Sequence, residues 1–154
     1  MGFTRAEPGT TTEVDPPPSG RPRTRRIVAA ALLAATVGAG LVVHVALPDT
    51  AATDIAGDAL YAVAAYLAVV LIAPRLPPLV VGAIAAAWCV GVELFQLTGL
   101  PLAWGAQFAP AMLVLGTVFD ARDLGVYVAT IALATACDLA LRAFARSRRQ
   151  TARP

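Results

Sequence analysis

Residues 77–99 read PPLVVGAIAAAWCVGVELFQLTG, and this stretch decides the fold. An apolar run begins after two prolines, and only Glu93 and Gln96 interrupt it before Gly99. About 20 mainly apolar residues are needed to cross the hydrocarbon core of a bilayer. We therefore expect residues 79–97 to form a transmembrane helix.

The composition of the whole chain agrees with this interpretation. The protein has 154 residues, of which 58% are hydrophobic and 14% are charged, and its mean hydropathy is +0.69. A soluble domain is typically about 45–50% apolar and about 25% charged. These values exclude a disordered chain and disfavour a water-soluble globule, and they predict an integral membrane protein with one domain.

Three further apolar runs are long enough to span a membrane, at 27–47, 57–73 and 124–144. The stretch 100–120 is also apolar, but prolines and glycines break it repeatedly. We predict an all-α, polytopic helical membrane bundle of four transmembrane helices plus a short re-entrant or interfacial segment. The alternative has five spans, with 100–120 crossing the membrane.

The arginines separate these alternatives. The chain has twelve basic residues, all arginine; five precede the first apolar run and five lie at the end of the last one or after it. With a cytoplasmic N-terminus, four spans leave only Arg122 outside, whereas five spans move the five C-terminal arginines outside and Arg122 inside. Positive residues favour the cytoplasmic side. We therefore expect four spans with both termini in the cytoplasm.

The domain organisation follows from these spans. We predict a disordered Arg/Pro-rich cytoplasmic tail at 1–24, a helical transmembrane domain at 25–145 and a basic cytoplasmic tail at 146–154. The run 27–47 exceeds the about 7–15 residues of a signal-peptide core, so we expect an uncleaved span. Arginine without lysine, together with frequent alanine, suggests a bacterial source. The expected location is the bacterial cytoplasmic (plasma) membrane, with several passes.

Few residues suit a cofactor or a nucleic-acid partner. The chain has one histidine and two cysteines, Cys89 and Cys137, both inside apolar runs, so we expect no metal site and no cofactor. The arginine-rich ends lack interleaved aromatic residues, which argues against nucleic-acid binding. The expected partners are the lipid bilayer and either a second copy of the chain or other membrane proteins.

Polar residues inside apolar helices are the informative ones, because exposing them to lipid costs free energy. Glu93 and Gln96 are three residues apart and so share one helix face, which we expect to point into the bundle. Asp138 and Arg142 have the spacing of an ion pair within a helix. Asp120 lies close enough to Arg122 for a local pair.

Two aspartates at the starts of apolar runs suit helix N-caps. Asp58 begins the second run, with Tyr61 one turn later, and Asp123 comes before the fourth, with Tyr127 one turn later. In the four-span topology these residues lie at the extracytoplasmic end of the bundle. Glu93 and Gln96 lie at the same end.

The polar residues therefore converge on one layer, which His44 and Trp104 also reach. The candidate polar cluster comprises Asp58, Tyr61, Glu93, Gln96, Asp123 and Tyr127. One hypothesis is a small pocket that opens outward, with Glu93 as its buried carboxylate. The alternative is a structural polar network that fixes the register of the helices.

Three short motifs stand out: residues 57–61 read GDALY, residues 93–97 read ELFQL and residues 115–127 read LGTVFDARDLGVY. Together they resemble a family of bacterial membrane proteins known as domain of unknown function 2809. Their order and spacing are similar to the family pattern over about residues 25–144. The family is distantly similar to VanZ-like proteins, and this resemblance implies a location and an architecture rather than a chemistry.

The sequence shows no nucleophile with an adjacent base and no phosphate-binding loop, and we assign no catalytic residue. It favours a small, non-enzymatic integral membrane protein, an accessory or cell-envelope-related module with an outward-facing polar layer. One alternative is a membrane enzyme or binding protein for a lipid-linked envelope substrate that uses Glu93. Another is a proton-conducting oligomer.

Overall fold

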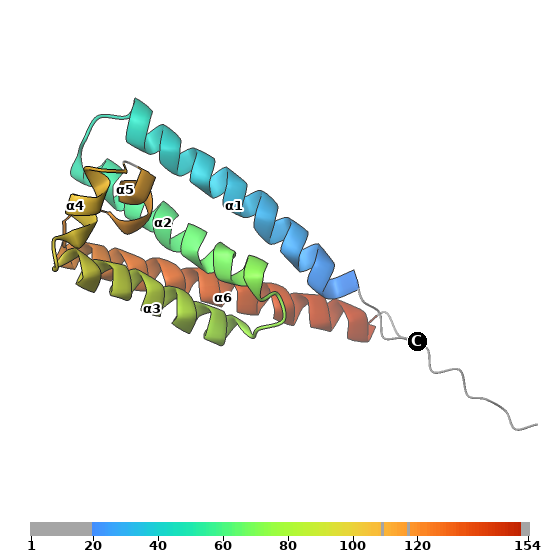
Figure 1. Cartoon of the computed structure of the whole chain (residues 1–154). Helices are drawn as coiled ribbons and strands as arrows, with labels where there is room; N and C mark the ends of the chain where they lie inside the picture. Colours follow the sequence, from blue (N-terminus) through green and yellow to red (C-terminus); the bar gives the residue numbers. More distant parts are fainter. Residues whose placement is uncertain (1–19, 109, 117, 152–154) are drawn as a thin grey trace, which may run out of the picture.

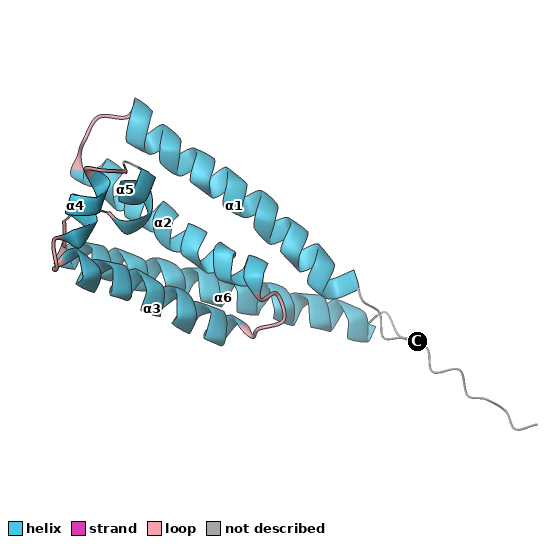
Figure 2. Cartoon of the chain, viewed as in Figure 1, coloured by secondary structure: helices cyan, strands magenta, loops and turns pink. Residues whose placement is uncertain are grey.

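The computed structural model describes residues 20–108, 110–116 and 118–151, and within these ranges the regular structure is helical (Figures 1 and 2). Its helices are α1 (Gly20–Ala46), α2 (Ala51–Ile72), α3 (Pro78–Gln96), α4 (Leu100–Gly105), α5 (Pro110–Leu115) and α6 (Ala121–Thr151).

Four of these helices are long and apolar enough to cross a membrane. The candidate spans are Pro22–Ala46, Ala51–Ile72, Pro78–Gln96 and Ala121–Arg148, with peak mean hydropathies between 1.8 and 2.2. The prediction of an all-helical protein with four transmembrane helices is confirmed. Figure 1 shows the start of α1 and the end of α6 at the same end of the bundle.

The five-span alternative is wrong. Between α3 and α6 the described chain forms α4 and α5, each six residues long. At about 1.5 Å of rise per residue, such a helix covers less than a third of the bilayer core. Figure 1 shows both short helices at the end of the bundle far from the termini, where they form the predicted short segment.

Helix α2 begins earlier than predicted, and Asp58 is therefore not its N-cap. Thr50 caps the helix: its hydroxyl accepts a hydrogen bond from the backbone N–H of Thr53, and the Thr53 hydroxyl accepts one from the N–H of Thr50. This reciprocal arrangement satisfies donors that a helix start leaves free. The helix therefore starts at Ala51, and Asp58 lies two turns inside it.

The N-cap predicted at Asp123 is also misplaced, because α6 begins at Ala121. The side chain of Asp120 accepts a hydrogen bond from the backbone N–H of Arg122 at 2.8 Å, which is the interaction expected of an N-cap. Asp123 is consequently free to face another part of the protein from the first turn of the helix.

The first and last helices of the chain, α1 and α6, extend past the limits predicted for the transmembrane domain. Helix α1 already begins at Gly20, and α6 continues to Thr151, so parts of both predicted tails are helical. The remainder of the predicted N-terminal tail, residues 1–19, lies outside the described residues.

Helix α2 is the centre of the bundle. It packs against α1, α3 and α6, and α3 packs against α6. Gly82 of α3 lies so close to Thr135 of α6 that a Cβ atom would overlap the threonine hydroxyl. Small residues allow helices in lipid to approach this closely. The core consists of Ala29, Ala62, Tyr66, Val70, Val81, Ala85, Cys89, Tyr127 and Ile131.

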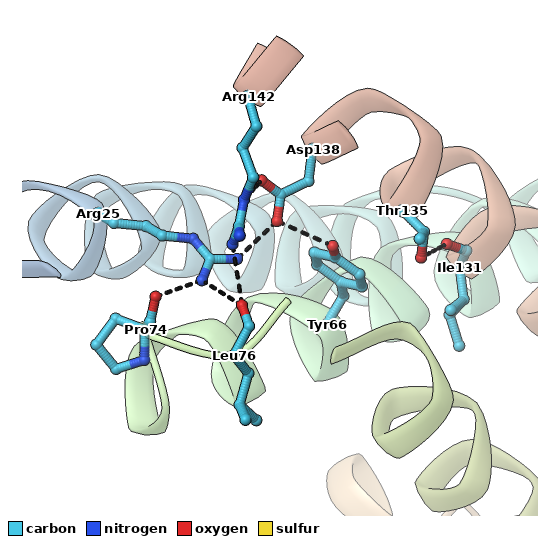
Figure 3. A network of polar contacts seen from close by, with 8 residues as sticks. All are labelled: Arg25, Tyr66, Pro74, Leu76, Ile131, Thr135, Asp138 and Arg142. Carbon is cyan, nitrogen blue, oxygen red and sulfur yellow. Dashed lines mark hydrogen bonds and ion pairs between the residues drawn. The ribbon is translucent and has the colours of Figure 1, made fainter. Parts of the chain in front are cut away.

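A polar network ties three helices together near the termini (Figure 3). The predicted pair of Asp138 and Arg142 is confirmed, with 3.0 Å between Oδ1 and Nε. Arg25 of α1 joins it, with its Nη2 at 2.6 Å from Asp138 Oδ2, and the hydroxyl of Tyr66 in α2 donates to the same oxygen at 3.1 Å.

The two arginines of this network also bind the connection between α2 and α3. Arg25 donates to the carbonyl oxygens of Pro74 and Leu76, and Arg142 donates to that of Leu76 at 3.0 Å. The guanidinium groups thereby satisfy carbonyl oxygens of the loop between α2 and α3. The network fixes α1, α2 and α6 to one loop.

Candidate acidic pocket

A cavity of about 570 Å³ lies at the opposite end of the bundle from the Arg25 network. Six parts of the chain form its wall: the end of α1, the α1–α2 connection, the first turns of α2, the end of α3, the segment before α6 and the start of α6. We call it the acidic pocket. It is lined by Gly40, Val43, His44, Asp49, Thr53, Asp54, Gly57, Asp58, Glu93, Gln96, Gly116, Val118, Phe119, Asp120, Arg122, Asp123 and Tyr127.

Negative charge dominates the described lining, which contains six acidic side chains and one arginine. Arg122 lies near three of the acids: its Nη2 is 3.8 Å from carboxylate oxygens of Asp54 and Asp120, and its Nε is 3.6 Å from Asp123 Oδ1. These distances exceed those of hydrogen bonds. One partly exposed guanidinium therefore lies near three carboxylates without making a close contact with any of them.

Glu93 is the most deeply buried acid of the pocket, with no exposed surface. Both of its oxygens accept hydrogen bonds: Oε1 from the hydroxyl of Tyr127 at 3.2 Å and Oε2 from the backbone N–H of Asp120 at 3.3 Å. This side chain thus ties α3 to α6 and to the residue that caps α6. It positions the wall of the pocket.

Gln96 lies on the same face of α3, as its spacing from Glu93 predicts, and is only 7% exposed. Its Nε2 donates to the carbonyl oxygen of Leu115 at 2.9 Å. Its Oε1 is buried and has no hydrogen-bond partner among the described residues. The neighbouring Gly116 has a φ of 63°, and a Cβ there would overlap the Gln96 amide nitrogen.

The two aspartates predicted as caps instead face the pocket. Asp58 Oδ2 and Asp123 Oδ1 are buried, and no donor group of the described residues forms a hydrogen bond with them, although Arg122 Nε lies 3.6 Å from Asp123 Oδ1. The two carboxyl groups lie within hydrogen-bonding reach of each other across α2 and α6, and Glu93 is near Asp58. The pocket therefore brings four of the six predicted cluster residues into one wall as acceptors: Asp58, Glu93, Gln96 and Asp123.

The two tyrosines of the predicted cluster have different positions. Tyr127 lines the pocket and is bound to Glu93. Tyr61 lies behind it, with 5.9 Å between the ring centroids. The Tyr61 hydroxyl donates to the carbonyl of Val114 at 2.6 Å and accepts from the indole N–H of Trp88 at 2.9 Å, so it supports α5.

Sequence reasoning did not place Asp54 in the pocket. Asp54 and Asp58 are four residues apart and share a helix face, which would have been evident had α2 been predicted to start before Asp54. His44 lies at the rim as expected. Trp104 lies at the same end but packs against Phe95, with 5.4 Å between ring centroids, and does not line the cavity.

Metal binding has no support in the described residues. Across residues 20–108, 110–116 and 118–151, no group of three or more His, Cys, Asp or Glu side chains is arranged to hold a metal ion.

Fold and site define a small multi-pass membrane protein with an acidic pocket at one end of its bundle. The family described as "Protein of unknown function (DUF2809)" matches residues 47–131, which is more than half of the chain, and the protein belongs to this family. The match includes every pocket residue except those of α1. No curated protein and no solved structure matches the chain.

Proposed function

We propose that this protein is a non-enzymatic cell-envelope module of the bacterial plasma membrane, and that its acidic pocket binds a small polar ligand on the extracytoplasmic side. The observation that carries the proposal is the set of buried oxygens without partners, on Asp58, Gln96 and Asp123. Buried polar atoms are almost always hydrogen-bonded in proteins. Three in one cavity indicate a missing donor, which a ligand would supply.

The orientation is supported by the distribution of arginine over the described bundle. Arg122 alone lies at the pocket, whereas Arg23, Arg25, Arg26, Arg75, Arg142, Arg146 and Arg148 lie toward the other end, in the first turns of α1, the α2–α3 connection and the last turns of α6. Arginine-rich ends favour the cytoplasm. The pocket then faces outward, where envelope components are within reach.

Binding fits the lining better than catalysis does. The described lining has no serine, cysteine or lysine nucleophile, and both oxygens of its most buried acid are held by Tyr127 and Asp120. Binding needs only that acceptors be held in place, and the surrounding helices do this. The bilayer is the one partner that this proposal requires.

Thiol labelling in intact cells tests the proposal. In a background with Cys89→Ala and Cys137→Ala, Val43→Cys places a thiol on the pocket wall, and Val42→Cys places a matched thiol on the exposed apolar face of α1. We expect a membrane-impermeant maleimide to label Val43→Cys from outside and to leave Val42→Cys unlabelled in lipid. Labelling of Val43→Cys only after the cells are opened would contradict an outward pocket.

A further inference from the structure

We infer that the acidic pocket takes a primary or secondary ammonium group, which it holds through N–H donors. This inference rests on the proposed function, because it names the chemical class of the ligand of the same site. It excludes anions, neutral sugars and quaternary ammonium groups as ligands of comparable affinity.

The first step is the hydrogen-bonding character of the free atoms. Asp58 Oδ2 and Asp123 Oδ1 are carboxylate oxygens, and Gln96 Oε1 is an amide oxygen. Oxygens of these kinds accept hydrogen bonds from N–H and O–H donors. A ligand that binds these oxygens must carry hydrogen-bond donors, and an ammonium group carries several of them.

The second step is that the amide of Gln96 cannot turn its donor side to the pocket. The carbonyl oxygen of Leu115 can only accept, so Nε2 must remain on that side of the amide. Gly116 packs directly against the same nitrogen. The free atom of this buried side chain is therefore the oxygen, and Gln96 acts on the pocket as an acceptor.

The third step is charge. Arg122 is the one described cation among six acids of the lining, and it lies beside Asp54, Asp120 and Asp123. Arg122 is near Asp58 but makes no ion pair with it within 4.0 Å among the described residues, and the carboxyl group of Asp58 faces Asp123. A positively charged ligand between these two carboxylates would relieve their repulsion, whereas an anion would add to it.

The fourth step separates N–H donors from quaternary ammonium groups. Quaternary ammonium ligands are typically held over aromatic faces. The described lining offers Phe119 and Tyr127 as its aromatic residues, and Tyr127 is buried and bound to Glu93. Oxygen acceptors, not an aromatic cage, dominate the wall, and a cavity of about 570 Å³ has room for an aminoalkyl group.

The experiment measures the binding of small amines to the full-length protein in nanodiscs of phosphatidylcholine. Ethanolamine is titrated as the probe, with choline as the matched compound that lacks N–H donors, and binding is followed by calorimetry. We expect ethanolamine to bind about tenfold or more tightly than choline, because the trimethylammonium group of choline has no N–H to donate to these oxygens. Equal binding of the two, or no binding of ethanolamine, would overturn the inference.

Two variants locate the binding. Asp58→Asn removes the charge of a buried acceptor, and Asp54→Asn makes the same change one turn earlier on an exposed side chain. We expect Asp58→Asn to weaken ethanolamine binding by about tenfold and Asp54→Asn to weaken it much less. Equal losses would contradict the assigned acceptors. The comparison of ethanolamine with choline on the unchanged protein does not depend on the folding of either variant.

The ammonium could belong to a lipid headgroup or to a soluble amine, and nanodiscs with phosphatidylethanolamine distinguish the two. Loss of soluble ethanolamine binding in these nanodiscs indicates an occupied pocket and a lipid source. Undiminished binding indicates a soluble source, and both results support the ammonium class. If glucose or phosphate, rather than ethanolamine, protects Val43→Cys from labelling, the ammonium inference fails while the proposed function stands.

Discussion

Arg25 and Asp138 are 113 residues apart in the sequence, yet the guanidinium of one lies 2.6 Å from the carboxylate of the other. Their contact joins the first helix to the last at the end of the bundle far from the acidic pocket (Figure 3). Both side chains are about one-fifth exposed, so the pair is largely shielded from solvent. Such a contact orders the bundle without being visible in local sequence patterns.

Replacement of this arginine should destabilise the bundle. Arg25→Met keeps an apolar side chain of similar length but removes the guanidinium. The carbonyls of Pro74 and Leu76 then have fewer hydrogen-bond donors. Arg142 remains as the one cation paired with Asp138 among the described residues. We expect a loss of about 2–4 kcal/mol, measured by unfolding in detergent. Arg23→Met, at an exposed position two residues earlier, is the control. Equal losses in the two variants would show that the pair is not a specific support.

The contact between Gly82 and Thr135 should tolerate no added methyl group. Gly82→Ala would drive a Cβ into the Thr135 hydroxyl and force α3 and α6 apart, at a cost of about 1–3 kcal/mol. Gly91→Ala on the same helix is the matched control, because nothing lies within 4 Å of its added Cβ. Unfolding experiments measure the stability of both variants. Thr135→Ala is then added to Gly82→Ala, and the double variant shows whether removal of the hydroxyl restores part of the lost stability.

Gly116 should be required for the shape of the pocket. Gly116→Ala combines a backbone in the left-handed region, which costs about 1–2 kcal/mol for other residues, with an overlap against the Gln96 amide. Gly99→Ala is the control, because Gly99 has a φ of 70° but open space around it. We expect a larger loss of stability for Gly116→Ala, together with faster thiol labelling at Val43→Cys. Identical behaviour of the two variants would argue that Gln96 is not held by this packing.

Glu93 should be needed for its hydrogen bonds more than for its charge. Glu93→Gln can still accept from the backbone N–H of Asp120, and its amide can donate to the hydroxyl of Tyr127, so we expect a change of less than about 1 kcal/mol. Glu93→Leu leaves both partners unsatisfied and should cost about 2–4 kcal/mol. Thermal unfolding of the two variants decides this, and a larger loss for Glu93→Gln than for Glu93→Leu would refute it.

The C-terminus should lie in the cytoplasm. A reporter fused after Pro154 should be active only on the cytoplasmic side, and a tag inserted at Asp49 should be reached from outside, because the arginine-rich end favours the cytoplasm. The opposite result for both positions would place the acidic pocket inside. The proposed envelope ligand would then be wrong, although the geometry of the pocket would remain.

The spans and their number were predictable because each depends on residues that are adjacent in the chain. The apolar run that begins after Pro77 is bounded by prolines and by Gly99, and the observed helix, Pro78–Gln96, starts and ends within one residue of the predicted span. The shared helix face of Glu93 and Gln96 was also predictable, because it follows from the helical period alone. The starts of α2 and α6 were misplaced, because Thr50 and Asp120 cap these helices before the predicted apolar runs at 57–73 and 124–144 begin.

The sequence by itself determined that this is a membrane protein of four helices with a cluster of polar residues at one end, because hydropathy, helical period and arginine placement are properties of the linear chain. Only the tertiary structure decided which acceptors are satisfied. Glu93 obtains both of its partners from α6 and the residue before it, whereas Asp58, Gln96 and Asp123 each keep a free oxygen. That difference depends on how separate helices approach one another, and local spacing cannot specify it.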